Sequence, residues 1–259
     1  MATALITGAS SGIGLELSRI HAEKKDNLIL VARNISKLQE LKKELENSFG
    51  VSVICIQKDM SEVNAAIDIF ENVKHLGIEV DYLINNAGFG DYGFFHEADW
   101  KKLEQMLMLN IVSLTQLTKL IGEQMALRRK GKIMNVASVA AFQPGPLMAV
   151  YFATKSYVLN FSEAVNNELK GFGVTVTALC PGPTESKFME VAKMNESALI
   201  KGKTLPSSKS VAIFGHNAMM KGKAVAIHGF MNAVLANVNR FVPRSLTVSI
   251  TRFLMNKAN

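Results

Sequence analysis

A tyrosine and a lysine four residues apart, in the segment Tyr151-Phe152-Ala153-Thr154-Lys155, are well suited to proton transfer. In a helix, residues at positions i and i+4 lie on one face, so the phenol and the ammonium would be neighbours. A free phenol ionises near pH ~10, and a nearby fixed cation favours the phenolate. The pair therefore predicts a general acid/base whose pKa is lowered by Lys155, although ordinary half-exposed helical pairs have the same spacing.

The N-terminal segment predicts a site for a dinucleotide. A short apolar run leads into Thr7-Gly8-Ala9-Ser10-Ser11-Gly12-Ile13-Gly14, and a helical pattern follows over residues 15–24. In such a turn Gly8 permits the sharp bend, Gly12 lets the backbone approach a pyrophosphate, and Gly14 lets helix and strand pack closely. The first N–H groups of the helix would face the phosphates, and we assign Ser10, Ser11 and Ile13 to the same site. Packing alone is the alternative explanation for three glycines in this turn.

Further motifs occur in a fixed order along the chain: Asn85-Asn86-Ala87-Gly88, Ser138 thirteen residues before Tyr151, and Pro181-Gly182 after an apolar run. With the glycine turn and the Tyr–Lys pair, they resemble the short-chain dehydrogenase/reductase family over residues 3 to about 190. Each motif alone is weak, but their joint occurrence in this order is specific. The resemblance implies a Rossmann-type fold, a nicotinamide cofactor, and hydride transfer to or from a carbonyl or alcohol substrate.

The family mechanism implies a task for each matching catalytic residue. Tyr151 would donate a proton to the carbonyl oxygen, and Lys155 would lower the Tyr151 pKa and reach the nicotinamide ribose. Ser138 would hydrogen-bond the substrate oxygen as negative charge develops on it. Asn110, which lies in a long helical pattern, would hold a water that links Lys155 to solvent.

The resemblance also implies further cofactor contacts. Asn86, Ala87 and Gly88 would line the wall beside the adenosine ribose, and Thr184, after Pro181 and Gly182, would contact the carboxamide of the nicotinamide. Asp59 would contact the adenine. An N-cap for a helix that starts near Ser61 is an alternative role for Asp59, and the two roles can coexist.

The end of the second predicted strand bears on the choice of cofactor. An acidic side chain about 20 residues after the glycine turn would hold the ribose hydroxyls of NAD. This chain instead has Ala32-Arg33-Asn34. Because Arg33 can neutralise a 2′-phosphate, the sequence predicts NADP(H) in preference to NAD(H). An ordinary solvated surface charge is the alternative for Arg33.

The alternation of short apolar runs with helical segments predicts an α/β fold. We expect one domain, residues 1–259, with a Rossmann-type doubly wound parallel sheet of about seven strands, helices on both faces and a C-terminal helical tail. The strands are expected at residues 2–7, 27–32, 51–56, 80–84, 131–137, 174–180 and 223–228.

Two segments rich in apolar residues indicate the polarity of the substrate. In the resembling family the segment after the sixth strand, here about 185–208, often closes over the site, and it contains Phe188, Met189, Val191, Met194, Leu199 and Ile200. The residues between Ser138 and Tyr151 add Phe142, Pro144, Leu147 and Met148. Together they predict an apolar carbonyl substrate, with ordinary core packing as an equally good explanation.

The tail, residues 230–259, spaces its apolar side chains in a helical pattern and places Arg240, Arg244, Arg252 and Lys257 between them. This pattern predicts a basic amphipathic hairpin or pair of helices broken at Pro243. Such a tail could lie on an anionic membrane surface. Because amphipathic helices usually bury against protein, we favour cover for a subunit interface or a sheet edge.

Composition narrows the classes of partner. The net charge of +7 comes from 29 basic and 22 acidic residues that lack any nucleic-acid signature, so we expect no nucleic-acid partner. The five histidines and two cysteines show no ligand spacing, so we expect no metal and no disulfide. With a strand near Met1 and no apolar stretch of ~18 residues, we expect a cytoplasmic chain, with peripheral membrane contact as the alternative.

The resemblance implies a homodimer or homotetramer formed through the helices that carry Asn110 and Tyr151. A non-catalytic NADP(H) sensor and a membrane-docked scaffold are the other functions that we considered. The complete set of Asn110, Ser138, Tyr151 and Lys155 argues against a sensor, because a protein without turnover has no physical need for it.

Overall fold

The structure is a computed structural model that describes residues 1–186, 188, 192, 204–239 and 241–256. Over these residues, seven parallel strands form one sheet in the order β3-β2-β1-β4-β5-β6-β7. The strands are β1 (Thr3–Thr7), β2 (Asn27–Ala32), β3 (Val53–Gln57), β4 (Tyr82–Asn85), β5 (Gly131–Val136), β6 (Val174–Cys180) and β7 (Val225–Ile227). All seven predicted strands are confirmed, with ends within two residues. The strand order reverses between β1 and β4, and the crevice at such a point is where doubly wound folds bind ligands.

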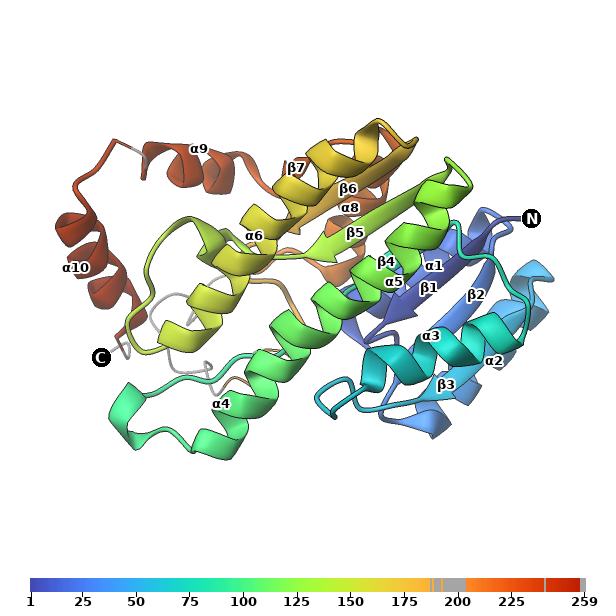
Figure 1. Ribbon diagram of the computed structural model, residues 1–259. Helices are drawn as coiled ribbons and strands as arrows, with labels where there is room; N and C mark the ends of the chain where they lie inside the picture. The colour runs from blue at the N-terminus through green and yellow to red at the C-terminus, as the bar shows by residue number, and fades with distance from the viewer. Residues whose placement is uncertain (187, 189–191, 193–203, 240, 257–259) are drawn as a thin grey trace.

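Helices cover both faces of the sheet (Figure 1). On one face the apolar side chains of the sheet pack with α1 (Gly12–Glu23), α2 (Ile35–Phe49) and α8 (Ser208–Met220). On the other face they pack with α3 (Ala65–His75), α5 (Leu114–Leu127) and α6 (Ala149–Lys170). Strands covered on both sides have no polar face, which explains why the central strands read as unbroken apolar runs.

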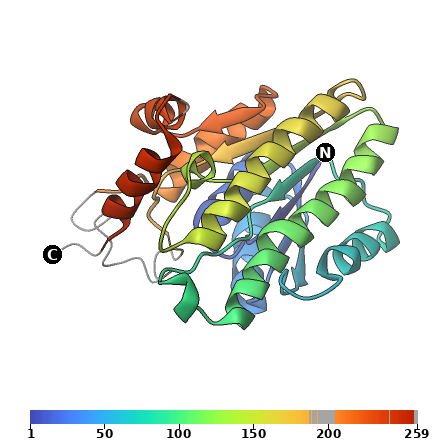
Figure 2. The ribbon, with the colours of Figure 1, turned by 60° about the vertical axis from the view of Figure 1, so that its left-hand side comes forward.

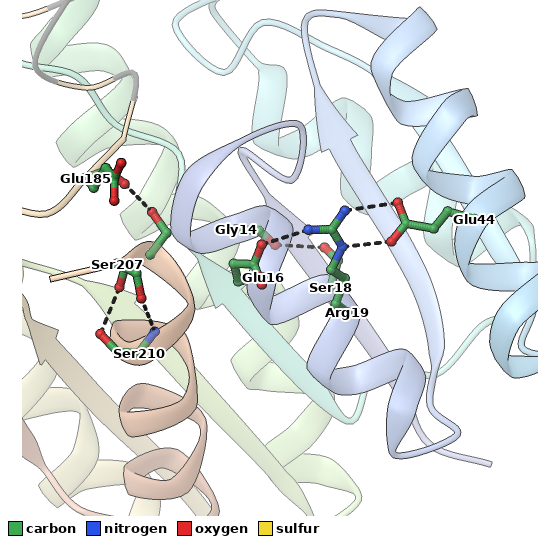
Figure 3. Close-up of polar contacts among 9 residues, drawn as sticks. Gly14, Glu16, Ser18, Arg19, Glu44, Glu185, Ser207 and Ser210 are labelled. Atoms are coloured by element: carbon green, nitrogen blue, oxygen red, sulfur yellow. Dashed lines mark hydrogen bonds and ion pairs between the residues drawn. The ribbon is translucent and has the colours of Figure 1, made fainter.

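The helix after the glycine turn is tied to its neighbour α2. Arg19 on α1 donates two hydrogen bonds to the Glu44 carboxylate on α2, at 2.8 and 3.0 Å, and a third to Glu16 at 2.8 Å (Figure 3). The guanidinium lowers the pKa of the Glu44 carboxyl, mainly through these hydrogen bonds. A bidentate Arg–carboxylate pair fixes orientation as well as distance. These contacts therefore fix α1 against α2.

The long helix that was predicted around Asn110 is interrupted. It consists of α4 (Trp100–Leu107), a π-helical turn over Met108–Ser113, and α5. The interruption cannot be predicted from the sequence, because an extra residue in one helical turn leaves the apolar spacing nearly unchanged. Single π-helical turns are often found at functional sites, and this one contains the buried Asn110.

The tail forms the predicted pair of helices, α9 (Phe230–Val238) and α10 (Arg244–Met255), with Pro243 directly before α10. In both views these helices, in red, lie together at one end of the molecule (Figures 1 and 2). The Tyr92 hydroxyl donates a 2.6 Å hydrogen bond to the Met255 carbonyl, so the end of α10 is joined to the loop after β4. No helix among the described residues is long and apolar enough to span a bilayer.

Candidate active site

The glycine turn is packed directly against the Asn86-Ala87-Gly88 segment. Gly8 and Gly12 have φ of +68° and +58°, a region that favours glycine. A Cβ on Gly8 would lie 2.8 Å from Asn86 Nδ2 and 3.0 Å from Ala87 Cα. The Asn86 side chain in turn donates to the carbonyls of Thr7 and Gly8, at 2.9 and 3.2 Å. Two motifs separated by more than 70 residues thus form one rigid wall.

Gly14 acts through packing. A Cβ on Gly14 would lie 2.5 Å from the Gly8 carbonyl oxygen and would overlap Asn86 Nδ2. Gly14 is absent from the lining of the cavity described below, unlike the other residues of the turn that we assigned to the cofactor. Its place agrees with close packing between α1 and the turn, rather than with direct contact to a cofactor.

Replacing Gly14 with alanine should lower the free energy of unfolding by about 1–3 kcal/mol, because the added methyl group overlaps backbone that cannot move freely. Weaker nucleotide binding should accompany this loss. The matched control is Gly122→Ala in α5, where the new Cβ would meet only side-chain carbons at an ordinary 3.5 Å. That control should be neutral or slightly stabilising. Urea unfolding measures both, and equal stability for the two variants would contradict the packing role.

Lys155, Asn110 and Gly88 meet at the end of β5. The buried Lys155 Nζ donates to the Val136 carbonyl at 2.7 Å. The Asn110 amide donates to the Phe89 carbonyl at 3.0 Å and to Thr154 Oγ1 at 3.1 Å. A Cβ on Gly88 would lie 3.2 Å from Asn110 Oδ1 and 3.4 Å from Lys155 Nζ. A side chain at position 88 would therefore crowd both polar groups.

Tyr151 and Ser138 lie on the adjoining wall. Lys155 Nζ is 5.8 Å from the centre of the Tyr151 ring. Ser138 begins a short 3-10 helix, Val139–Phe142, by accepting a hydrogen bond from the Ala140 N–H at 3.1 Å. The structure thus places Ser138, Tyr151 and Lys155 at one cavity, while Asn110 stands behind it, outside the lining.

The pKa of Tyr151 moves in the opposite direction to the one predicted. Burial raises it to about 12, and a hydrogen bond with Ser138 opposes this only in part. Burial also lowers the pKa of Lys155 to about 8. Desolvation disfavours the charged form of each group, and the Lys155 ammonium is directed to the Val136 carbonyl. At neutral pH, Tyr151 is therefore a protonated phenol beside a lysine that remains largely charged.

One cavity of about 800 Å³ contains nearly all the predicted site residues. It extends from the glycine turn and the end of β2 to Tyr151. The predicted residues in its lining are Gly8, Ser10, Ser11, Gly12, Ile13, Arg33, Asp59, Asn86, Ala87, Gly88, Ser138, Tyr151, Lys155, Pro181, Gly182 and Thr184. Residues that follow six different strands meet at this cavity. It lies at the carboxyl ends of the strands, where the reversal of strand order predicts a ligand site.

Arg33 and Asp59 face each other at one end of this cavity. Arg33 Nη1 lies 3.8 Å from Asp59 Oδ2, and the Arg33 side chain is 75% exposed. Asp59 Oδ1 accepts from the Ser61 N–H at 2.9 Å and from its hydroxyl at 2.7 Å. The alternative prediction of a helix N-cap at Asp59 is wrong, because α3 begins only at Ala65, after Asn64. Asp59 instead stabilises the turn after β3.

The other end of the cavity is apolar. The ring of Phe188 lies 5.3 Å from that of Tyr151, and Met148 and Phe152 also line the cavity. Of the apolar residues that were predicted near the substrate, Phe142, Pro144 and Leu147 lie outside the lining. Met189, Val191, Met194, Leu199 and Ile200 lie outside the described residues.

The two ends of the 185–208 segment are joined. The Glu185 N–H donates to the Pro206 carbonyl at 3.0 Å, and the Ser208 hydroxyl donates to the Glu185 carbonyl at 2.7 Å. Ser207 accepts a hydrogen bond from the Ser210 N–H and so caps α8 (Figure 3). The predicted substrate segment therefore leaves and re-enters the fold at one fixed point beside the cavity.

The tail also forms part of this site, which its sequence pattern did not predict. Both α9 and α10 line the cavity, through Asn232, Leu235, Ala236, Thr251, Leu254 and Met255. Asp99, Lys102 and Gln105, at the start of α4, line it as well. The amphipathic pattern of the tail indicated two helices but nothing about their position. The hydrogen bond between Tyr92 and Met255 joins segments 163 residues apart, a pairing that no local pattern signals.

Replacing Tyr92 with phenylalanine should release the end of α10 from the cavity. A hydrogen bond of this kind contributes about 0.5–1.5 kcal/mol. We therefore expect KM for a bulky substrate to rise about twofold to tenfold, with little change for a small one and none in nucleotide affinity. Steady-state kinetics with substrates of two sizes measures this. Tyr82→Phe, at the start of β4, is the control. Equal effects on both substrates would contradict a positioning role for Tyr92.

The chain is similar to known proteins over most of its length. The model of the short chain dehydrogenase family matches residues 2–197. The chain is 35% identical over 184 residues to 17-beta-hydroxysteroid dehydrogenase type 3 of Mus musculus, covering 69% of this chain and 58% of that protein. It is 27% identical over 256 residues to very-long-chain 3-oxoacyl-CoA reductase of Homo sapiens, covering 96% and 79%.

Among solved structures, the short-chain dehydrogenase from Sphingobium yanoikuyae in complex with NADPH matches with a TM-score of 0.84 and 27% identity. That match covers 93% of this chain and 94% of the other. By contrast, the match to the mouse protein spans less than two thirds of that protein's length.

Proposed function

Because this chain belongs to the short-chain dehydrogenase family, whose members act on CH–OH and C=O groups, we propose that it is an NADPH-dependent reductase of an apolar, lipid-like carbonyl compound. The observation that carries this proposal is the arrangement of one cavity. Its polar end holds the glycine turn and Arg33, and its apolar end holds Ser138, Tyr151 and Lys155.

The residues present fit a nicotinamide dinucleotide. Gly8 and Gly12 put no side chain at two positions of the turn before and at the N-terminus of α1, where free N–H groups can bind phosphates. Arg33 lies at the end of β2, where the ribose of the adenosine would be expected. Bound there, the reduced nicotinamide supplies the hydride.

We assign the proton chemistry to this chain's own side chains. Tyr151 is protonated at neutral pH, so it can donate a proton to the carbonyl oxygen during reduction. Lys155 would stabilise the phenolate that remains, and Ser138 would hydrogen-bond the substrate oxygen. Asn110 Oδ1 and Lys155 Nζ both border Gly88, which supports a water link between them for the return of a proton.

The apolar end of the cavity supports a lipid-like substrate. Phe188, Met148 and Leu254 from three separate segments line it. The relatives named above are a hydroxysteroid dehydrogenase and a 3-oxoacyl-CoA reductase. We therefore propose a steroid ketone or a long-chain 3-oxoacyl thioester as the class of substrate.

We also propose that the chain forms a homodimer through α5 and α6. On α6, Tyr157 is exposed, stacks on Phe161 at 5.6 Å between ring centres and hydrogen-bonds Thr115 of α5. Aromatic residues on an exposed face of two adjacent helices support an interface there. A cytoplasmic location stays a prediction.

NADPH oxidation by the purified protein tests the proposed function. The panel comprises 3-oxoacyl thioesters, steroid ketones, quinones and small aldehydes. We expect turnover with one of the first two classes, at a higher kcat/KM than with small aldehydes. Tight NADPH binding without turnover across the whole panel would contradict the proposed reductase and favour the sensor.

A further inference from the structure

The last helix of the tail, α10, buries two threonines and exposes apolar side chains. On α10, Thr247 and Thr251 are buried one turn apart, and Thr251 lines the cavity. On the same helix Leu246, Ile250, Phe253 and Leu254 are exposed, at a spacing that forms one stripe. Apart from the buried Met255 at its end, α10 therefore has the reverse of the amphipathic pattern that buries a helix on its own protein.

The other helix of the tail, α9, also exposes most of its apolar side chains. On α9, Ala236 is the buried residue among nine, while the exposed apolar residues are Phe230, Met231, Val234, Leu235 and Val238. Phe230, Phe253 and Phe241, which lies between the helices, are 83%, 76% and 88% exposed. We call the exposed apolar residues of α9, α10 and Phe241 the tail face. So many exposed apolar side chains mark a binding surface.

A second segment with exposed aromatic residues lies beside α10. The Arg252 guanidinium sits 5.0 Å from the centre of the Phe94 ring, and Tyr92 bonds to Met255. Phe94, Phe95 and Trp100 are all exposed. Aromatic residues, tryptophan above all, are enriched where a protein meets the membrane–water interface.

The charge of the chain identifies the kind of partner. Residues 197–259 contain nine lysines and arginines and no aspartate or glutamate. Residues 1–196 contain 20 basic and 22 acidic side chains, so the excess positive charge of the protein lies wholly in this last stretch. Two copies that met through it would repel each other, whereas an anionic surface would attract it.

We propose that the tail face lies on an anionic lipid bilayer. Its phenylalanines and aliphatic side chains would enter the boundary between headgroups and acyl chains, and Arg244, which is exposed at the start of α10, would contact anionic headgroups. Docking does not depend on the proposed function. One consequence of docking rests on the proposed function. Because α9 and α10 also line the substrate end of the cavity, an apolar carbonyl compound would reach Tyr151 from the bilayer.

Vesicle sedimentation of the full chain tests the proposal. We expect binding to phosphatidylcholine vesicles that contain about one part in three phosphatidylserine, weaker binding to phosphatidylcholine alone, and weakening by added salt. The double variant Phe230→Ser, Phe253→Ser should bind at least about tenfold more weakly. Arg244→Glu should bind anionic vesicles at least about fivefold more weakly.

Matched controls lie elsewhere on the surface. Leu127→Ser, at the end of α5, removes a side chain that is 74% exposed, and Lys43→Glu reverses an exposed charge on α2. Both should bind vesicles like the unmodified chain. Equal losses in controls and tail-face variants would overturn the proposal, as would no sedimentation with either vesicle. Loss of self-association by the double variant, without loss of vesicle binding, would assign the face to a second copy.

Turnover of a water-soluble ketone separates this proposal from the proposed function. None of Phe230, Phe253 and Arg244 lines the cavity, so these variants should retain turnover. Retained turnover with reduced vesicle binding supports docking through the tail face. An unmodified chain that binds vesicles but turns over no carbonyl compound would contradict the reductase and leave docking intact.

Discussion

Replacing Tyr151 with phenylalanine should reduce kcat by about 10²–10⁴-fold while the affinity for NADPH stays the same. The substitution removes one oxygen and keeps the ring, which packs between Phe188 and Phe152 at 5.3 and 6.1 Å between ring centres. The site should therefore keep its shape. It would lose the hydroxyl proton that we assign to the carbonyl oxygen.

Two measurements separate chemistry from binding in this variant. Fluorescence titration gives the dissociation constant of NADPH, and single-turnover kinetics with saturating nucleotide gives the rate of hydride transfer. Tyr157→Phe is the matched control, since it removes a phenol six residues along the same helix that hydrogen-bonds Thr115. Turnover by the Tyr151 variant close to that of the unmodified chain would remove Tyr151 as the acid.

The pKa of Tyr151 is raised, although the spacing of Tyr151 and Lys155 predicted that it would be lowered. Spacing along a helix predicted that Lys155 lies near the phenol, and the structure confirms that the two are neighbours. Spacing could not reveal that both groups are buried, and burial outweighs the effect of the lysine. The raised pKa keeps the phenol protonated at neutral pH, as a free phenol also is, and it makes Tyr151 a weaker acid until a bound cofactor or substrate changes its surroundings.

The fold could be predicted from sequence because its strands are buried on both faces. Residues such as Leu5, Ile29 and Ile133 form continuous apolar runs, and these runs end where the sheet ends. The glycine turn could also be predicted from the sequence, since a backbone with φ of +68° at Gly8 strongly favours glycine. These features depend on local patterns alone.

The substrate end could not be predicted in the same way. Thr251 and Leu254 reach the cavity only because α10 folds back onto the loop after β4, where Tyr92 holds it. The inverted pattern of α10 can be recognised only when its buried face is known. Long-range contacts between segments with no shared motif leave no signal in a single sequence.

Replacing Arg33 with aspartate should lower the ratio of kcat/KM for NADPH to that for NADH by about 10²–10³-fold. Loss of charge-assisted hydrogen bonds to a 2′-phosphate would remove about 1.5–3 kcal/mol, or about 10–100-fold, and the new carboxylate would repel the phosphate further. The same carboxylate could accept a hydrogen bond from the ribose hydroxyl of NADH. Both effects change the ratio in one direction.

Lys58 provides the discriminating control for Arg33. It also lines this end of the cavity, but its ammonium is already paired with Glu62 and Asp68, at 3.0 and 2.8 Å. Lys58→Gln should therefore change the cofactor ratio much less than Arg33→Asp. Because the Arg33 side chain is 75% exposed, its effect should also shrink at high salt. A ratio that is unchanged in the Arg33 variant, or changed equally in both, would show that another group selects the cofactor.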